Sequence, residues 1–567
     1  MAERMNPHSD AGDGSDRLGA ANRRRVLRAL HAAFGLSHLR EGQEAVIARV
    51  LAGRPTIAVM PTGAGKSLCY QLPATLLKGR TIVVSPLIAL MKDQCDKLHE
   101  LGIPAVALHS MLDADQRREA AASDAKIVYV TPERLATQAL LRNLAAGPVD
   151  LLVVDEAHCV SQWGHDFRPA FLEIRRAADA LGRPAMLALT ATATAEVLAD
   201  IAAQLGMPEA RVINTGVYRP NLRYRVELMA DEAAKRERVA ELAAQTPGCG
   251  LVYCATVAAT EAIHRLLLDA GESAACYHGR MRAAARRDAQ EAFMRGERRV
   301  MVATNAFGLG IDKPDIRFVA HYQLPAGLDA YYQESGRAGR DGDEAECTLL
   351  YHEGDQSLQH FFMGGRYPSF DDVDALYRAL SKQPPSGGWS ARTLCAAVER
   401  PRGKLQVALS LLRDGGIVGA DRQGRLRLRR TGVDESELRA LPFRYQEKRQ
   451  RDRQALEEIV AYAHAGSCRW QALLRHFGET PAAPCGRCDN CLRIAEMAQR
   501  DALRAAGGER PAWTAPPPPA VRFAPGDRVR VRRYGIGTVT QADALAVTVA
   551  FGSGEPREFL ANRVRAA

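Results

Sequence analysis

Apolar runs alternate with helical patterns through the first two thirds of the chain, and they fall into two sets. The first set is TIAVM, TIVVS, KIVYVT, LLVVDE and MLALTAT, at 56–60, 81–85, 126–131, 151–156 and 186–192. The second set is GLVYCAT, RVMVATN, FVAHYQ and ECTLLY, at 250–256, 299–305, 318–323 and 346–351. Runs that are apolar throughout are typical of parallel strands with helices on both faces. The pattern predicts an α/β fold with two parallel-sheet domains, at 25–213 and 214–355.

The pattern changes after residue 355. Residues 372–430 predict three helices followed by a hairpin, and the stretch SARTLCAAV begins on a candidate helix N-cap, Ser390. The second strand of the hairpin, RLRLRR, alternates Arg and Leu. Three helices and a hairpin in this order predict a winged-helix-like module.

Three further segments differ in composition. Residues 1–24 are rich in Gly, Asp, Ser and Ala, so we expect a disordered tail. A charged helix at about 444–465 begins a helical module at 444–495, and a Pro-rich linker follows at 496–520. Residues 521–567 alternate apolar and polar positions around Gly turns, as in a small β-barrel.

The chain has 567 residues and a formal net charge of +10, and no apolar run reaches the length of a membrane span. Its first residues are polar and lack the apolar core of a signal peptide. We therefore expect a cytosolic protein without a membrane partner. The positive charge favours a polyanionic partner, because binding releases counterions from the polyanion.

Four of the twelve cysteines lie close together, at Cys468, Cys485, Cys488 and Cys491. The last three are separated by two residues each, a spacing that can place thiolates around one tetrahedral ion. Free cysteines in a loop are the alternative, but they do not require this spacing. The sequence predicts a Zn²⁺ site, and four thiolates leave no open position for chemistry, so the ion is structural.

A glycine-rich loop follows the first strand in MPTGAGKSLCY, residues 60–70, and precedes a helix. Glycines let backbone amides close around phosphates, while Lys66 can reach the β- and γ-phosphates and Ser67 can ligate Mg²⁺. A structural turn between strand and helix is the alternative. The residues expected to surround a nucleotide are Thr62, Gly63, Ala64, Gly65, Lys66 and Ser67.

An acidic pair, Asp155 and Glu156, ends the buried run LLVVDE. Alone, such a pair is usually the start of a loop. Together with a phosphate-binding loop, Asp155 is expected to hold Mg²⁺ and Glu156 to orient the attacking water.

The second sheet domain contains YYQESGRAGRDG, with Gln333, Arg337 and Arg340. Arginines three residues apart share one face of a helix, and that face can simply be solvated. The functional alternative is a pair of arginine fingers that reach the γ-phosphate across the cleft between the two domains.

These stretches resemble the RecQ family of superfamily-two DNA helicases, over about residues 25–355 and again over 444–495. The matching stretches are FGLSHLREGQ (34–43), MPTGAGKSLCYQLPA (60–74), SPLIALMKDQ (85–94), TPERL (131–135), DEAHCVSQWGHDFRP (155–169), LTATAT (189–194), RPNL (219–222), VATNAFGLGIDKPDIRFVAHY (302–322) and QESGRAGRDG (333–342). The resemblance implies two RecA-like domains that use ATP and Mg²⁺, and a separate module that binds Zn²⁺. It also implies 3′ to 5′ unwinding of DNA in repair and recombination, in the cytoplasm or nucleoid of a bacterium.

The resemblance also implies roles for single residues. His158 belongs to the catalytic set, and Arg40 and Gln43 read the adenine. Near Leu36 the family usually has an aromatic residue that stacks on the base, whereas leucine is aliphatic.

In the family the loop after the acidic pair is rich in aromatic residues. The resemblance therefore implies that Trp163 and Phe167 stack on the bases of single-stranded DNA or insert beside them. It implies that Arg168 engages either phosphate or the network on the ATP side. The alternative for Trp163 is a core position.

The order of modules differs from that of the better-known family members, because the winged-helix-like segment precedes the zinc module. We expect its arginines to bind duplex DNA, although a solvated face is an equal alternative; they are Arg425, Arg427, Arg429 and Arg430. Residues 521–567 are similar to the Tudor-like tails of some UvrD-type helicases. A protein partner is slightly favoured there over DNA.

The sequence therefore predicts an ATP-dependent DNA helicase. Two alternatives stay open: an RNA-directed or duplex-translocating ATPase of the same superfamily, and a DNA-binding scaffold with little turnover.

Overall fold

The structure is a computed structural model. It describes residues 17–109, 124–161, 169–307, 311–382, 384, 388–398, 400, 402–421, 425–480, 483–506, 523–531, 535–542, 546–552, 556–560 and 564–567. The chain divides into two compact units, Met1–Leu492 and Arg493–Ala567.

The first sheet has seven parallel strands in the order β3-β4-β2-β5-β6-β1-β7. They are β1 (Thr56–Val59), β2 (Arg80–Val84), β3 (Ala105–Leu108), β4 (Ile127–Val130), β5 (Val149–Val154), β6 (Ala185–Thr190) and β7 (Arg211–Asn214). The central strands are buried on both faces, which explains why they read as continuous apolar runs.

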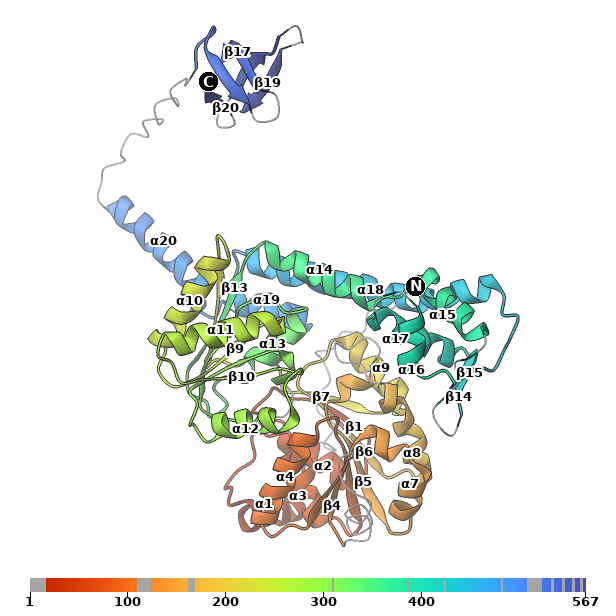
Figure 1. Cartoon of the computed structure of the whole chain (residues 1–567). Coiled ribbons are helices and arrows are strands. Elements are labelled where there is room, and N and C mark those ends of the chain that lie inside the picture. Colours follow the sequence, from red (N-terminus) through yellow and green to blue (C-terminus); the bar gives the residue numbers. More distant parts are fainter. Residues whose placement is uncertain are drawn as a thin grey trace, which may run out of the picture. The chain divides into compact units, whose positions relative to one another are not determined.

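Helices cover both faces of this sheet (Figure 1). One face packs against α2 (Gln43–Leu51), α3 (Leu68–Leu76) and α4 (Ile88–Glu100), and α1 (Ala20–Phe34) packs on α2 and α3. The other face packs against α6 (Pro132–Leu135), α7 (Gln138–Ala145), α8 (Ile174–Ala180) and α9 (Ala195–Leu205), with the short 3-10 helices η2 (Ala157–Val160) and η3 (Pro169–Glu173).

The second sheet has six parallel strands in the order β10-β11-β9-β12-β13-β8. They are β8 (Leu222–Leu228), β9 (Cys249–Tyr253), β10 (Ala274–Tyr277), β11 (Val300–Ala303), β12 (Ile316–His321) and β13 (Ala345–Tyr351). One face packs against α10 (Glu232–Gln245) and α11 (Val257–Asp269), and the other packs against α12 (Ala283–Met294), η4 (Asn305–Phe307) and α13 (Leu328–Ser335). The two predicted parallel sheets are confirmed.

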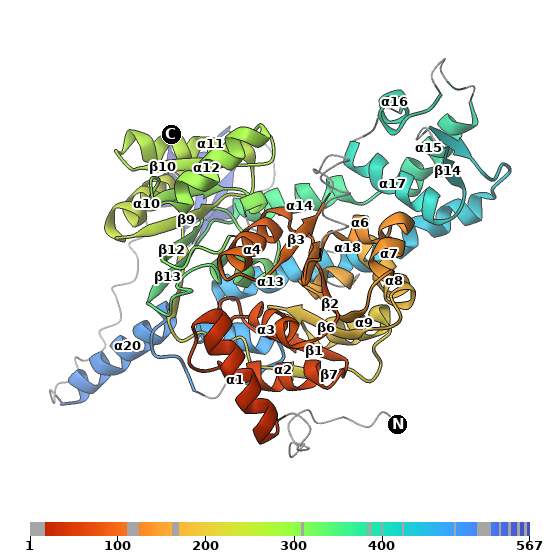
Figure 2. The ribbon, with the colours of Figure 1, turned by 90° about the horizontal axis from the view of Figure 1, so that it is seen from below.

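A helical hairpin leaves the second sheet and carries the next module at its far end. Its helices are α14 (Gly354–Arg366) and α18 (Glu435–His464), which lie side by side (Figures 1 and 2). Between them the chain forms α15 (Phe370–Ser381), α16 (Ala391–Ala397), α17 (Arg402–Asp414), β14 (Val418–Ala420) and β15 (Leu426–Leu428). This is the order expected of a winged helix, and Ser390 caps α16 as expected by accepting the Thr393 N–H at 3.1 Å.

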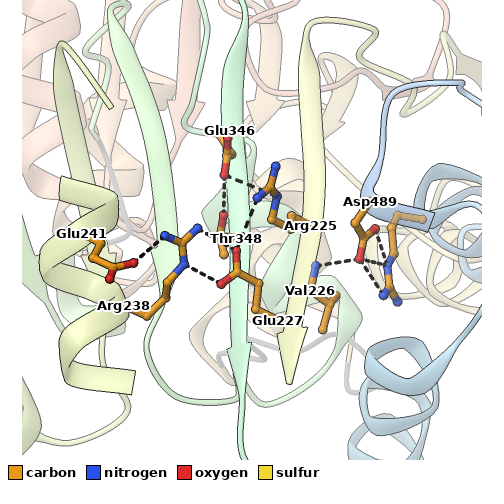
Figure 3. Close-up of polar contacts among 9 residues, drawn as sticks. Arg225, Val226, Glu227, Arg238, Glu241, Glu346, Thr348 and Asp489 are labelled. Carbon is orange, nitrogen blue, oxygen red and sulfur yellow. Dashed lines mark hydrogen bonds and ion pairs between the residues drawn. The ribbon is translucent and has the colours of Figure 1, made fainter. Parts of the chain in front are cut away.

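The zinc-module helix α19 (Arg469–His476) packs into the core of the second sheet. Trp470 is 2% exposed, contacts Tyr218 and Tyr224 with ring centroids 4.8 and 5.0 Å away, and donates to the Leu222 carbonyl. Asp489 accepts the Val226 N–H at 3.1 Å (Figure 3). Both bonds satisfy backbone groups of β8, the edge strand of its sheet, so this module covers an edge that would otherwise be open to pairing.

The second unit begins within α20 (Asp489–Ala506) and ends in a five-stranded antiparallel sheet, in the order β19-β18-β17-β16-β20. The strands are β16 (Arg528–Val531), β17 (Gly535–Ala542), β18 (Ala546–Ala550), β19 (Arg557–Leu560) and β20 (Val564–Ala566). Valines of four strands form its core. Within the described strands β19 and β20 do not pair, so the expected barrel is not closed there.

Several expected boundaries were wrong. Helix α1 already begins at Ala20, inside the stretch expected to be a disordered tail, and α20 continues to Ala506 through part of the expected linker. Helix α18 begins at Glu435, well before position 444, although it contains Pro442. No helix within the described ranges is long and apolar enough to span a membrane.

Trp470→Ala should lower the free energy of unfolding by about 3–5 kcal/mol, because it empties a core site that the zinc module shares with the second sheet. Calorimetry of the full chain checks this through the transition that contains the second sheet. Phe361→Ala is the matched control, since Phe361 is 75% exposed and its loss should cost little. Equal shifts for both variants would contradict a shared core.

Candidate functional site

The glycine-rich loop connects the buried end of β1 to the N-terminus of α3, as expected. Gly63 and Gly65 have φ angles of +87° and +78°, which suit glycine and let the loop curl back on itself. The Lys66 Nζ donates to the Met60 carbonyl at 3.1 Å and so lies within the loop. The loop thus presents an ammonium group and the amides of a helix N-terminus, the combination that binds phosphate.

Arg40 and Gln43 both contact the glycine-rich loop. The Gln43 Nε2 donates to the carbonyls of Ala64 and Gly65 at 3.0 and 3.1 Å, and its Oε1 accepts the Arg40 N–H. The Arg40 guanidinium donates to the Gly63 carbonyl. These bonds hold the loop against the start of α2, so Gln43 would have to exchange partners to contact adenine as the resemblance implies. Leu36 is 45% exposed.

The acidic pair lies at the carboxyl end of β5, next to the loop. Glu156 has a φ of +49°, an uncommon conformation for a residue with a side chain, and caps η2. His158 is buried, with its Nδ1 3.2 Å from the Thr190 hydroxyl and 3.5 Å from Glu156 Oε2. Thr190 in turn donates to the Thr192 carbonyl. The acidic pair is therefore connected to the end of β6.

Burial shifts the ionisation of this group of residues. Burial and the Glu156 carboxylate raise the pKa of Asp155 to about 7, although Lys66 acts in the opposite direction. Burial lowers the pKa of Lys66, against the effect of Glu156 and Asp155. A cation between the carboxylates would favour their charged forms, as Mg²⁺ does.

Arg337 and Arg340 do not share a helix face, and that expectation was wrong. Helix α13 ends at Ser335, just after the half-buried Gln333, and both arginines follow in a turn in which Gly339 has a φ of +56°. Arg219 fixes this turn: its guanidinium donates to the carbonyls of Gly336, Ala338 and Gly339 at 2.5–2.8 Å.

The arginine turn lies directly on the glycine-rich loop, although it belongs to the other sheet. A Cβ atom built on Gly63 would lie 3.6 Å from the Arg340 side chain, and one on Gly336 would lie 3.8 Å from Thr62. Arg340 donates to Asp312 at 2.8 Å, and Asp312 accepts from Lys97 of α4 at 2.9 Å. The carboxylate of Asp312 therefore bridges the two sheets beside Arg340.

The site retains polar capacity that suits a nucleotide and a metal ion. Glu156 Oε2, Arg337 Nε and Arg340 Nε are buried without a hydrogen-bond partner in the described chain. Burial and the charge of Arg337 lower the pKa of Arg340 to about 10, which shows that positive charges are crowded here. A bound polyphosphate would offset this charge, and a hydrated Mg²⁺ would satisfy Glu156. The arrangement can therefore bind and hydrolyse a nucleoside triphosphate.

The four predicted zinc ligands converge. The sulfur atoms of Cys468, Cys485, Cys488 and Cys491 all lie within 4.8 Å of one another. Cys468 is the N-cap residue of α19. Backbone N–H groups of Arg469 and Cys491 donate to the Cys488 sulfur at 3.4 Å, and these bonds orient it within the cluster.

The expected DNA contacts are less fully described. Trp163, Phe167 and Arg168 lie outside the described residues. In the hairpin, Arg425 pairs with Asp421 and Arg430 pairs with Glu437, while Arg427 and Arg429 are exposed. These ion pairs weaken the case for this hairpin as a DNA-binding surface.

Sequence reasoning gave no role to Arg219, Asn221 or Asp312. The signal was present, since all three lie in stretches that resemble the family, RPNL and GIDKPDIR. Asn221 donates to the carbonyls of Gly339 and Asp343, which adds to the bonds made by Arg219. The contacts of Arg219 and Asn221 with the arginine turn span more than a hundred positions in the chain, so residue spacing cannot predict them.

Three family models match the chain. They are DEAD/DEAH box helicase at residues 40–201, helicase conserved C-terminal domain at 234–342, and RecQ zinc-binding at 427–492.

The chain is 40% identical over 362 residues to the probable ATP-dependent DNA helicase RecS of Bacillus subtilis, covering 63% of this chain and 73% of that protein. It is 34% identical over 494 residues to the ATP-dependent DNA helicase RecQ of Synechocystis, covering 83% of this chain and 99% of that protein. Among solved structures, the Mycobacterium smegmatis helicase Lhr bound to ssDNA and AMP-PNP aligns with a TM-score of 0.50 at 21% identity, covering 74% of this chain and 61% of that one.

Cys488→Ser should yield a protein with less than one zinc per chain and greater sensitivity to protease, because metal-ligand energy contributes to folding in such modules. Elemental analysis of the purified protein checks the metal content. Cys276→Ser, outside the cluster, should keep full zinc. A wild-type protein without zinc would refute the assignment.

Proposed function

This chain belongs to the RecQ family of ATP-dependent DNA helicases, and we propose that it moves 3′ to 5′ along one DNA strand by closing and opening the cleft between its two sheets. One observation supports this most directly. The arginine turn belongs to the second sheet domain, and it packs against the glycine-rich loop of the first. ATP at this junction touches both halves, so its hydrolysis changes the contact between them.

The residues around the cleft divide the work. Lys66 binds the β- and γ-phosphates, and Ser67 and Asp155 hold the metal ion. Bound Mg²⁺ would neutralise charge that develops on the phosphate oxygens. Glu156, held by its unusual backbone near His158, orients the attacking water. Arg337 and Arg340 stabilise the transferring phosphoryl group, and Gln333 supports them from the last turn of α13.

We assign the DNA contact to the loop that carries Trp163, Phe167 and Arg168. It begins at Ser161, which is buried and donates to Asp200 at 2.7 Å, and Phe171 behind it is also buried. Stacking of bases on this loop shifts the neighbouring segment, which holds Glu156 and His158. Binding of a strand can therefore be coupled to hydrolysis over a few residues.

The modules serve this motor in different ways. We propose that 25–213 and 214–355 are the two motor domains, that 372–430 contacts DNA ahead of them, and that 444–495 is a zinc-stabilised support. Residues 521–567 bind a protein partner. The protein acts on DNA in the bacterial cytoplasm or nucleoid.

Strand displacement tests the proposed function. The protein should separate 3′-tailed duplexes and leave 5′-tailed and blunt ones paired, with ATP hydrolysis stimulated by DNA more than by RNA. Lys66→Ala should abolish hydrolysis and unwinding and leave affinity for single-stranded DNA nearly unchanged, because DNA affinity is spread over many contacts. Unwinding from 5′ tails, or substantial turnover in the Lys66 variant, would refute the proposal.

Arg219→Lys should lower kcat for DNA-stimulated ATP hydrolysis by about tenfold to a hundredfold, because lysine cannot bridge three carbonyls and the arginine turn moves by a fraction of an ångström. The KM for ATP should change much less, since the phosphate-binding loop is intact. Arg225→Lys on the neighbouring strand is the control, where exposed ion pairs contribute little. A loss confined to thermal stability would show a merely structural role for Arg219.

A further inference from the structure

A second cavity, of about 490 Å³, lies where the helical hairpin meets the inserted module. Its walls come from the end of α14, the start of α15 and parts of α17 and α18. The volume is within the ordinary range of ligand-binding pockets, roughly 300–1,000 Å³. None of the residues discussed for the ATP site, the zinc site or the hairpin arginines lines it.

The lining of this cavity is basic. Lys404, Arg439 and Arg449 contribute to it, and none of the described residues that line it is acidic. Arg439 pairs with Glu435 at 2.6 Å, whereas Lys404 and Arg449 form no ion pair within the described part of the chain. By contrast, the cavity of about 420 Å³ between the two sheets is lined by three carboxylates and one guanidinium, those of Asp329, Glu334, Asp452 and Arg451. The basic cavity therefore selects an anion.

Aromatic side chains supply the second property of the cavity. Phe443 lines it and is 65% exposed, an unusual state for a large apolar side chain at a concave surface. The guanidinium of Arg439 lies 4.3 Å from the centroid of the Phe370 ring, which fixes a planar cation over one wall. Pro442 lies just before Phe443 and has no backbone N–H, so α18 lacks one helical hydrogen bond beside the wall of the cavity.

We propose that this cavity binds nucleotides of single-stranded DNA, with Lys404 and Arg449 on phosphates and Phe443 stacked on a base. A nucleic acid strand combines regularly spaced anions with flat apolar rings, and the cavity offers a partner for each. The inference rests on the proposed function only in that the chain acts on DNA. It adds a strand contact that the motor cleft does not provide.

The position of the cavity connects it to the motor. Helix α14 begins at the second sheet, where the buried Lys235 and Asp355 pair at 2.9 Å, and its last residues reach the cavity. A strand held there is linked to the second sheet through one continuous helix. The contact between DNA and the cavity should therefore raise the affinity for tailed DNA. It should not change the catalytic step of ATP hydrolysis.

The test compares full-length variants in binding to oligo(dT) over a series of salt concentrations. Lys404→Gln with Arg449→Gln should make the slope of log affinity against log salt shallower by about 1.4, since each lost phosphate contact on a single strand contributes about 0.7. The matched control is Arg413→Gln with Arg453→Gln, which removes two exposed cations from the same two helices outside the cavity. Equal slopes for both pairs would refute the proposal.

The aromatic contact is tested by Phe443→Ala, which should weaken oligo(dT) binding roughly tenfold. Phe361→Ala is its control, because Phe361 is also exposed, on α14, but does not line the cavity. Crosslinking of 5-iodouracil DNA at Phe443, mapped by mass spectrometry, gives a readout that a folding defect would not produce. A crosslink at Phe443 supports the proposal, and its absence in the wild type would overturn it.

Two further measurements distinguish the cavity from the ATP site, and a DNA strand from smaller or different anions. DNA-independent ATP hydrolysis should be unchanged in all cavity variants, whereas a wild-type protein without any ATPase activity would refute the proposed function and leave oligo(dT) binding as an independent readout. The cavity variants could instead weaken binding of dTMP or ATP and leave the affinity for oligo(dT) unchanged. That result would show a free-nucleotide site and overturn the assignment to a DNA strand. Loss of affinity for an acidic peptide alone would overturn it in the same way.

Discussion

The arrangement of the cleft depends on holding like charges together out of water. Arg219, Arg337 and Arg340 are largely buried around one turn, and their mutual repulsion contributes to the lowered pKa of Arg340. The guanidinium of Arg219 is stabilised by hydrogen bonds to backbone carbonyls. The guanidinium of Arg340 is partly compensated by one carboxylate, that of Asp312. The remaining positive potential faces the glycine-rich loop. A bound polyphosphate would offset this charge.

The zinc module is part of the second sheet rather than an appendage. Its cysteines, Trp470 and Phe477 belong to the same apolar core as the strands, and two of its polar groups satisfy the edge of β8. His476 lies 3.0 Å from Asp329 at the start of α13 and 3.1 Å from Glu458 of α18. Burial lowers the pKa of His476, but the two carboxylates outweigh it, so the pKa is raised. The ion thus stabilises the packing behind the arginine turn, at a distance from any chemistry.

Much of this could be predicted from sequence, and the exceptions have physical causes. The strands buried on both faces were predictable because nearly every position in them is apolar. Four strands were not predicted, namely β3, β7, β8 and β10, because they are short or alternate in burial and lie at sheet edges. The cysteine cluster was predictable because its spacing is local. The helical reading of Arg337 and Arg340 failed because two glycines and a distant arginine end α13 early. The role of Arg219 is set by tertiary contacts that no local pattern reports.

The longest helix has a mechanical consequence. Helix α18 has 30 residues, which corresponds to a rod of about 45 Å. Near one end Tyr462 contacts Tyr331 of α13, with ring centroids 5.6 Å apart, and near the other lies Pro442. A rod of this length that is clamped at its base acts as a lever. A load on the inserted module therefore becomes torque at the base, where the helix that leads into the arginine turn is packed.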